Sequence, residues 1–141
     1  MTNPVTDKDG NRLWYKNGEL HRTDGPAIER ADGEKQWYVN GKLHRTDGPA
    51  VEFADGTTMW YVNNERHRTD GPAVLWADGT KWWYINGQYH RTDGPAVEFA
   101  DGTKWWYVNN ECLTLAKWCK VTNKTPQEIT LLVLQYDLTT V

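Results

Sequence analysis

His44-Arg45-Thr46-Asp47-Gly48-Pro49-Ala50 is a heptad that the chain repeats without change. The other copies occupy residues 21–27, 67–73 and 90–96, so the spacing is always 23 residues. A fixed period of this length is typical of stacked supersecondary units, each too small to bury its own apolar face and completed by its neighbours. The sequence therefore predicts a repeat array.

Two β-forming runs follow each heptad and flank an Asp-Gly pair. In the unit that begins at His44, the runs are residues 50–54 and 57–62, on either side of Asp55 and Gly56. A two-residue Asp-Gly loop between such runs predicts a β-hairpin with a type I′ turn, in which both central residues have positive φ. Each unit ends on an Asn-Gly or Asn-Asn pair, which is a further turn signal because Asn tolerates the left-handed conformation.

Three turn signals per unit, counting the Asp-Gly-Pro of the heptad, leave two topologies open. Either the Asn-Gly and Asp-Gly-Pro turns form one longer return loop, or the chain coils as a three-sided β-helix. We favour the first, with two strands per unit, because Pro49 removes a ladder donor just where a strand would begin. Residues 63–71 are then a return loop that carries His67, Arg68 and Asp70.

Alternation along the second run of each unit assigns its side chains to the two faces of the sheet. One face carries Trp37, Trp60, Trp83 and Trp106, together with Val39, Val62, Ile85 and Val108. The other carries Tyr38, Tyr61, Tyr84 and Tyr107, beside Gln36, Met59, Trp82 and Trp105. Since both faces have aromatic rings, we expect one of them to be covered by curling, by a helix or by a partner.

The chain divides into three segments. Residues 1–20 match only the second half of the unit and form a partial N-terminal capping repeat, and residues 21–112 contain four 23-residue β-hairpin repeats. Residues 113–141 leave the pattern and form a C-terminal helical cap. The predicted fold is mainly β: an elongated single-layer antiparallel sheet of stacked β-hairpin repeats with a short C-terminal α-helical cap.

Two helices are predicted in the cap, the first over residues 115–120. The second begins at a capping box made by Thr125 and Glu128, with Pro126 at its first position, and runs to about Asp137. Its apolar stripe consists of Ile129, Leu132, Val133 and Tyr136, widened by Leu131 and Leu134. We expect this stripe to pack on the final hairpin around Trp106, and a docking surface for a partner is the alternative.

Composition narrows the classes of function. The net charge is -3 and the charges alternate in sign, so the basic stripe of a nucleic-acid-binding protein is missing from the sequence. The first ten residues are polar, and no run approaches the length of a membrane span. We therefore expect neither nucleic acid nor a membrane as partner, and a cytoplasmic location, which is the host cytoplasm if the chain is viral.

The Tyr-Val-Asn-Gly and Asp-Gly-Pro-Ala elements on a 23-residue unit resemble the MORN repeat, over roughly residues 9–110. The resemblance implies β-hairpins stacked into an elongated sheet, with a binding or scaffolding role. The heptad is also similar to repeats of bacteriophage proteins, which implies a viral origin and a host protein as partner, such as a component of a defence system. The aromatic pairs also look somewhat like choline-binding repeats of cell-wall proteins.

The heptads raise the question of metal or catalytic chemistry, because His and Asp lie three residues apart. Equivalent His residues of neighbouring units would be roughly 9.5 Å apart, too far to share a metal. We expect a structural role instead: Asp47 caps its own turn, Thr46 adds a hydrogen bond, and Arg45 pairs with Glu52 or an adjacent Asp. The structural turn residues are thus Asp24, Asp47, Asp70 and Asp93, with Gly25, Gly48, Gly71 and Gly94.

A catalytic centre is normally one asymmetric group of residues, whereas every polar group here recurs in equivalent surroundings. We therefore predict no enzyme activity, no cofactor and no metal. The predicted function is a protein-binding module or scaffold, whose partner contacts are Tyr38, Tyr61, Tyr84, Tyr107, Trp82 and Trp105. Two alternatives are self-association as a structural protein, and glycan or choline recognition by the pairs Trp82-Trp83 and Trp105-Trp106.

Overall fold

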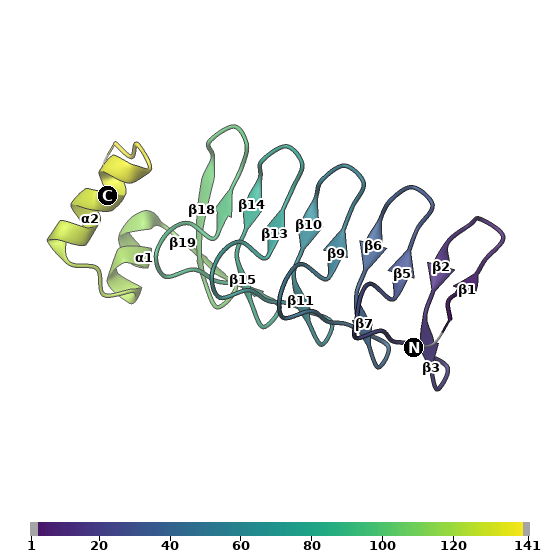
Figure 1. Cartoon of the computed structure of the whole chain (residues 1–141). Coiled ribbons are helices and arrows are strands. Elements are labelled where there is room, and N and C mark those ends of the chain that lie inside the picture. Colours follow the sequence, from purple (N-terminus) through teal and green to yellow (C-terminus); the bar gives the residue numbers. More distant parts are fainter. Residues whose placement is uncertain (1–2, 140–141) are drawn as a thin grey trace.

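The computed structural model describes residues 3–139, so the outermost residues of the first and last predicted segments, 1–2 and 140–141, lie outside the described residues. Figure 1 shows hairpins stacked side by side in chain order, with the N-terminus at one end and two helices at the other. The chain is mainly β, and its stacked hairpins form one long antiparallel sheet, as predicted.

The main sheet has eleven strands within the described residues, each paired with the next in the order of the chain. The strands contributed by the first half of the array are β1 (Val5–Thr6), β2 (Arg12–Leu13), β5 (Ile28–Glu29), β6 (Lys35–Gln36), β9 (Val51–Glu52) and β10 (Thr58–Met59). The rest are β13 (Val74–Leu75), β14 (Lys81–Trp82), β17 (Val97–Glu98), β18 (Lys104–Val108) and β19 (Glu111–Leu113).

A second, smaller hairpin was not predicted, and it is present in every unit but the last, where β18 and β19 belong to the main sheet instead. These hairpins pair β3 (Tyr15–Lys16) with β4 (Glu19–Leu20), β7 (Tyr38–Val39) with β8 (Lys42–Leu43), β11 (Tyr61–Val62) with β12 (Glu65–Arg66), and β15 (Tyr84–Ile85) with β16 (Gln88–Tyr89). The main sheet does have two strands per unit, but the predicted return loop 63–71 begins inside such a hairpin. Because the small hairpins lie outside the main sheet, each unit adds two strands to that sheet and successive units keep the same orientation.

The two kinds of turn differ from the prediction. At the Asp-Gly tips only the glycine has positive φ, as at Gly56 (91°). The Gly56 amide donates to the Phe53 carbonyl and the Phe53 amide to the Thr57 carbonyl, which is a three-residue loop with a bulge rather than a type I′ turn. Asp55 accepts from the Thr57 amide at 2.8 Å. Positive φ at both central residues occurs instead at the Asn pairs, as at Asn63 and Asn64.

The small hairpins cover the apolar face of the main sheet, so neither curling nor a partner is needed to cover it. In the middle of the array, Val51, Met59, Val74 and Ala73 form a buried cluster with Tyr84. Side chains of the small hairpins pack against this cluster, namely Leu43, Tyr61 and Tyr89. The core of the molecule is thus a thin layer that runs the length of the stack.

The cap consists of α1 (Leu115–Val121) and α2 (Pro126–Gln135), and the predicted capping box at Thr125 is present. Trp118, Cys119 and Leu132 form a buried cluster with Trp106, which confirms the predicted packing on the final hairpin. Leu131 and Leu134 do not widen the buried stripe, because they are 64% and 74% exposed on the outer side of α2.

Candidate functional site: slots between the repeats

Three similar cavities open between successive His-Arg-Thr-Asp loops, and we name them the first, second and third slot in chain order. Their volumes are about 540, 460 and 390 Å³. The loop that begins at Arg22 and the loop that begins at His44 are the two walls of the first slot, with Trp37 and Val39 between them. The second and third slots repeat this arrangement with Trp60 and Val62, and with Trp83 and Ile85.

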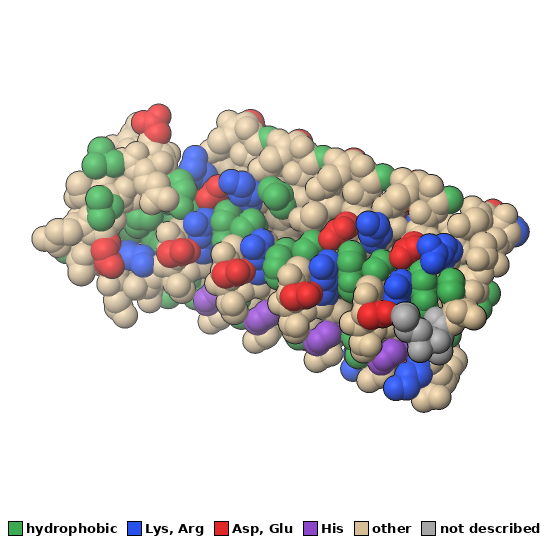
Figure 2. Space-filling view, in the orientation of Figure 1, with side chains coloured by type: hydrophobic (Ala, Val, Ile, Leu, Met, Phe, Trp, Pro, Cys, Tyr) green, Lys and Arg blue, Asp and Glu red, His purple; other side chains and the backbone are tan. Residues whose placement is uncertain are grey.

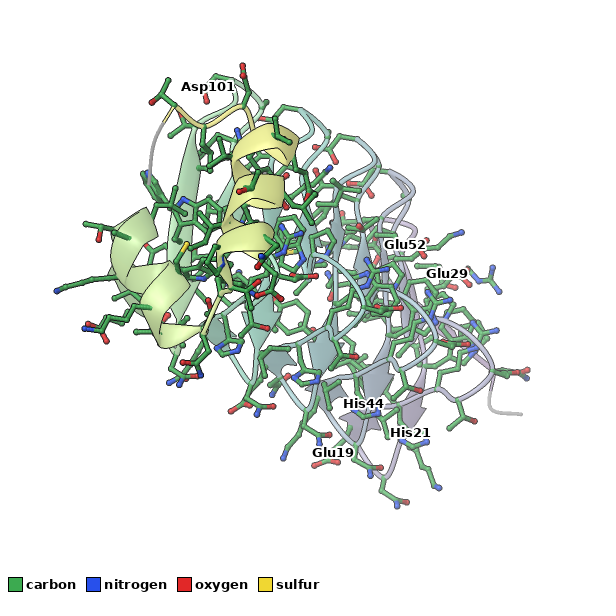
Figure 3. All side chains as sticks on the ribbon, turned by 90° about the vertical axis from the view of Figure 1, so that its left-hand side faces the viewer. Glu19, His21, Glu29, His44, Glu52 and Asp101 are labelled. Carbon is green, nitrogen blue, oxygen red and sulfur yellow. The ribbon has the colours of Figure 1, made fainter. Side chains whose placement is uncertain are left out.

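The slots lie along one face of the stack because each is built by the junction of two repeats. Figure 2 shows histidine side chains in a row along this face, with acidic and basic side chains beside them. Viewed from the helical end, His21 and His44 lie in line along the stack, as do Glu29 and Glu52 (Figure 3). The labelled tip residue Asp101 is far from these rows in the same view.

An arginine in each loop stacks on the tryptophan of the slot. The Arg45 guanidinium lies 4.0 Å from the centroid of Trp37, and the Arg91 guanidinium lies 3.8 Å from that of Trp83. Arg45 also donates to Asp47 at 2.9 Å and to Glu52 at 3.1 Å, which confirms the predicted pairing. A stacked, doubly paired arginine is held in one orientation, so the wall of the slot is preorganised.

The heptad aspartates do not cap their own turns, which corrects the predicted mechanism. Asp24, Asp47, Asp70 and Asp93 each accept from the arginine two residues earlier. For Asp24 and Asp70, this hydrogen bond is the main cause that lowers the pKa of the carboxyl group below its ordinary value. The predicted hydrogen bond of Thr46 is missing among residues 3–139, so its exposed hydroxyl is available in the slot.

The glycine of the heptad is required by the arginine rather than by a left-handed turn. Gly25, Gly48, Gly71 and Gly94 do not have positive φ. A Cβ atom at these positions would lie 2.6 to 3.0 Å from the guanidinium carbon of the arginine. The Gly-Pro pair thus lets the arginine fold back over its own loop, where it also donates to the proline carbonyl, as Arg45 does to Pro49.

The histidines connect the beginning of each repeat to its end. Nδ1 of His21, His44, His67 and His90 accepts from the backbone amide of the asparagine 19 residues later, at 3.0 to 3.3 Å. Within residues 3–139, no group of three His, Cys, Asp or Glu side chains could hold a metal ion. The four imidazoles therefore connect each heptad loop to the asparagine turn near the end of the same 23-residue unit.

We expect His67→Ala to lower the free energy of unfolding by about 1 kcal/mol, because the Asn86 amide loses its acceptor. His67→Asn should restore most of this loss, since an asparagine oxygen can occupy nearly the same position as Nδ1. Urea denaturation of both variants checks the prediction. Equal loss in the two variants would show that the ring matters for packing and not for the hydrogen bond.

The last repeat has no following His-Arg-Thr-Asp loop, and the cap takes its place. Leu113 and Thr114 stand where the next His and Arg would fall. Trp118 lies over Trp106 with ring centroids 4.6 Å apart, where an arginine lies over tryptophan in the other repeats. Its indole Nε1 donates to the Arg91 carbonyl at 2.9 Å. Burial raises the pKa of Tyr136, whose hydroxyl accepts from Arg91 Nη2 at 3.2 Å.

The predicted partner residues differ in their exposure to solvent. Tyr84 is 5% exposed and belongs to the core, so it presents almost no surface to a partner. Its burial follows from the small hairpin, which folds the tyrosine against Val74 and Met59. Tyr38, Tyr61, Tyr107 and Trp82 are half-buried, whereas Trp105 is 46% exposed and packs edge-on against Phe99. Their role in binding stays a prediction.

The sequence reasoning missed the slots, although it placed the residues that form them. Trp37 and Val39 were assigned to one face and the heptad to a loop, but the contact between Arg45 and Trp37 spans eight residues and a turn. The signal was the joint recurrence of tryptophan and arginine at a constant separation in every unit. A constant separation in equivalent units indicates a constant contact.

No model of a known protein family matches the chain, and no curated protein matches its sequence. Within the described residues, neither helix is long and apolar enough to cross a membrane. The resemblance to the MORN repeat stays a prediction.

Proposed function

We propose that the chain is a non-enzymatic, MORN-like protein-binding module whose partner lies along the three slots. The row of equivalent, preorganised cavities carries this proposal. One partner that spans several slots makes the same contact repeatedly, which raises its apparent affinity without any new chemistry. We further propose that the chain is phage-encoded and that its partner is a host protein, such as a component of a defence system.

An extended partner suits this surface better than a small ligand. The slots are open and shared between neighbouring repeats, and each has an arginine and a tryptophan, which are the residue types enriched at protein-binding hot spots. The walls need little reordering on binding, because the arginines are already held by Asp, by the proline carbonyl and by stacking on tryptophan.

The geometry disfavours the glycan or choline alternative. Trp82 packs edge-on against Trp76 under the sheet, whereas Trp83 lines the third slot. Trp105 packs against Phe99, whereas Trp106 packs against the cap. The two rings of each pair therefore lie on opposite sides of the strand and cannot enclose one sugar or one quaternary ammonium group.

The test is affinity capture from a lysate of the natural host with the wild-type chain and with Thr46→Phe/Thr69→Phe. Thr46 lines the first and second slots and Thr69 the second and third, so two bulky side chains obstruct all three. We expect this double variant to retain at least tenfold less of the protein that the wild type captures.

Thr103→Phe is the matched control, because Thr103 is exposed at a hairpin tip away from the slots. It should capture as much protein as the wild type. A partner that binds the double variant and the wild type equally well would contradict the proposal. Circular dichroism of each variant verifies that the sheet is intact.

A further inference from the structure

The first wall of each slot has two polar groups that make no hydrogen bond within residues 3–139. They are the backbone carbonyl and Nη2 of Arg22, Arg45 and Arg68. In each arginine, Nε and Nη1 are already engaged, by an aspartate and a proline carbonyl. Each slot therefore offers one free acceptor, which is the backbone carbonyl of the arginine. It also offers one free donor, which is Nη2 of a side chain that is held in place.

The same two groups of Arg91 are both paired, and aromatic side chains of the cap pair them. The Trp118 indole N–H donates to the Arg91 carbonyl, and Arg91 Nη2 donates to the Tyr136 hydroxyl. The Trp118 ring is 0% exposed, and its contact with Trp106 removes both rings from water. The last repeat thus shows which groups can pair with the first wall, although Trp118 there lies over Trp106 in the place that the second-wall arginine has over the tryptophan of each slot.

We propose that the three slots bind aromatic side chains of a protein partner, and that each takes an indole whose N–H donates to the free arginine carbonyl. A hydroxyl group, such as that of tyrosine, accepts from the free Nη2. The proposal rests on the proposed protein-binding function and specifies the chemistry of the partner. Trp118 and Tyr136 make these two hydrogen bonds to Arg91 on the last repeat, whereas in a slot the ligand would enter the open space beside the stacked arginine of the second wall.

The charges of the slot favour a neutral aromatic group over an acidic one. Every wall arginine already pairs with the aspartate of its own heptad, and Arg22 and Arg45 also pair with Glu29 and Glu52. A carboxylate that approaches Nη2 would meet these carboxylates at short range and be repelled. An indole or a phenol supplies the missing hydrogen bonds without adding a charge.

The repeat spacing favours a helical partner segment. Two strands per unit place the slots roughly 9.5 Å apart along the stack. On an α-helix, residues seven apart lie on the same face and about 10.5 Å apart, which is within the reach of a side chain. A helix with tryptophans at positions i and i+7 can therefore enter two neighbouring slots.

The first experiment needs no partner. The full ¹⁵N-labelled chain is titrated with N-acetyl-tryptophanamide while the indole NMR signals are followed. We expect shifts at Trp37, Trp60 and Trp83, which line the slots, and none at Trp76 and Trp105, which do not. The 1-methyl derivative of the probe lacks the N–H and should bind about fivefold more weakly.

Two helical peptides test the spacing. A peptide with tryptophans at i and i+7 should bind at least tenfold more tightly than one with tryptophans at i and i+5, which point to different faces. Thr46→Phe/Thr69→Phe should abolish this difference, whereas Thr103→Phe should retain it. Equal affinity of the two peptides, or equal binding of the methylated and unmethylated probes, would overturn the proposal.

Sedimentation measurements distinguish a foreign partner from a second copy of the chain. A concentration-dependent dimer that Thr46→Phe/Thr69→Phe abolishes would overturn the assignment to a partner, because the cap of another copy would then fill the slots. The titration and the host-lysate capture test different claims, so a negative result in one does not imply a negative result in the other. A silent titration removes aromatic docking, and only the capture decides whether the slot face binds a protein.

Discussion

Trp118→Ala should lower the free energy of unfolding by about 3 to 5 kcal/mol, the typical cost of removing a large aromatic side chain from a core. Trp118 has no exposed surface, and it packs on Trp106 and donates to the Arg91 carbonyl. Its loss leaves a cavity where the first helix of the cap packs on the final hairpin. Thermal and urea denaturation, followed by far-UV circular dichroism, measure the change.

Two further variants help to interpret the stability that Trp118→Ala loses. Trp118→Phe retains a ring but lacks the N–H, so it should cost clearly less than Trp118→Ala. Leu131→Ala is the control on α2, because Leu131 is largely exposed and its replacement should change stability by less than about 0.5 kcal/mol. If Trp118→Ala unfolds like the wild type, the cap does not stabilise the array.

Arg91→Ala should cost about 3 kcal/mol, and Arg68→Ala about half as much. Arg91 stacks on Trp83, pairs with Asp93 and Glu98, and donates to Tyr136 of the cap. Arg68 stacks on Trp60 and pairs with Asp70, but Leu75 occupies the position of the second carboxylate. Charged hydrogen bonds are worth about 1.5 to 3 kcal/mol when buried, and less when partly exposed.

Leu75→Glu provides the internal control for this comparison. Glu29, Glu52 and Glu98 accept from an arginine seven residues earlier, so a glutamate at position 75 should accept from Arg68. A double-mutant cycle between Arg68→Ala and Leu75→Glu should then give a coupling energy of about 0.5 to 1 kcal/mol. Zero coupling would show that the carboxylate of this loop does not stabilise the arginine.

The repeats made the architecture predictable because a fixed period fixes the stacking. The heptad at His44 and the tips at Asp55 and Gly56 were enough to predict two main-sheet strands per unit, and the change of pattern after Glu111 predicted the helices. The small hairpins were missed because the Asn pair was interpreted as part of one return loop with the Asp-Gly-Pro turn, whereas it is a hairpin turn of its own between β11 and β12. The turn type was wrong at Asp55 because Asp-Gly suits both a two-residue and a three-residue loop.

The candidate site was less predictable, because it depends on contacts between units. Period-2 alternation correctly separated Trp83 from Tyr84, but alternation cannot tell which face the chain itself will cover. The covering elements were the small hairpins, so Tyr84 became part of the core and Trp83 the floor of a slot. The arginine that completes the slot comes from a loop whose side-chain direction no periodicity describes.

Within the described residues the helical cap covers one end of the array, which matters for the order in which the units can fold. Each main-sheet strand pairs with the main-sheet strand that precedes it in the chain, so each finished hairpin presents an edge on which the next can form. We therefore expect the units to fold by templated addition, one unit at a time. The cap ends this series, because Trp118 covers Trp106 at the place where the arginine of a further unit would lie.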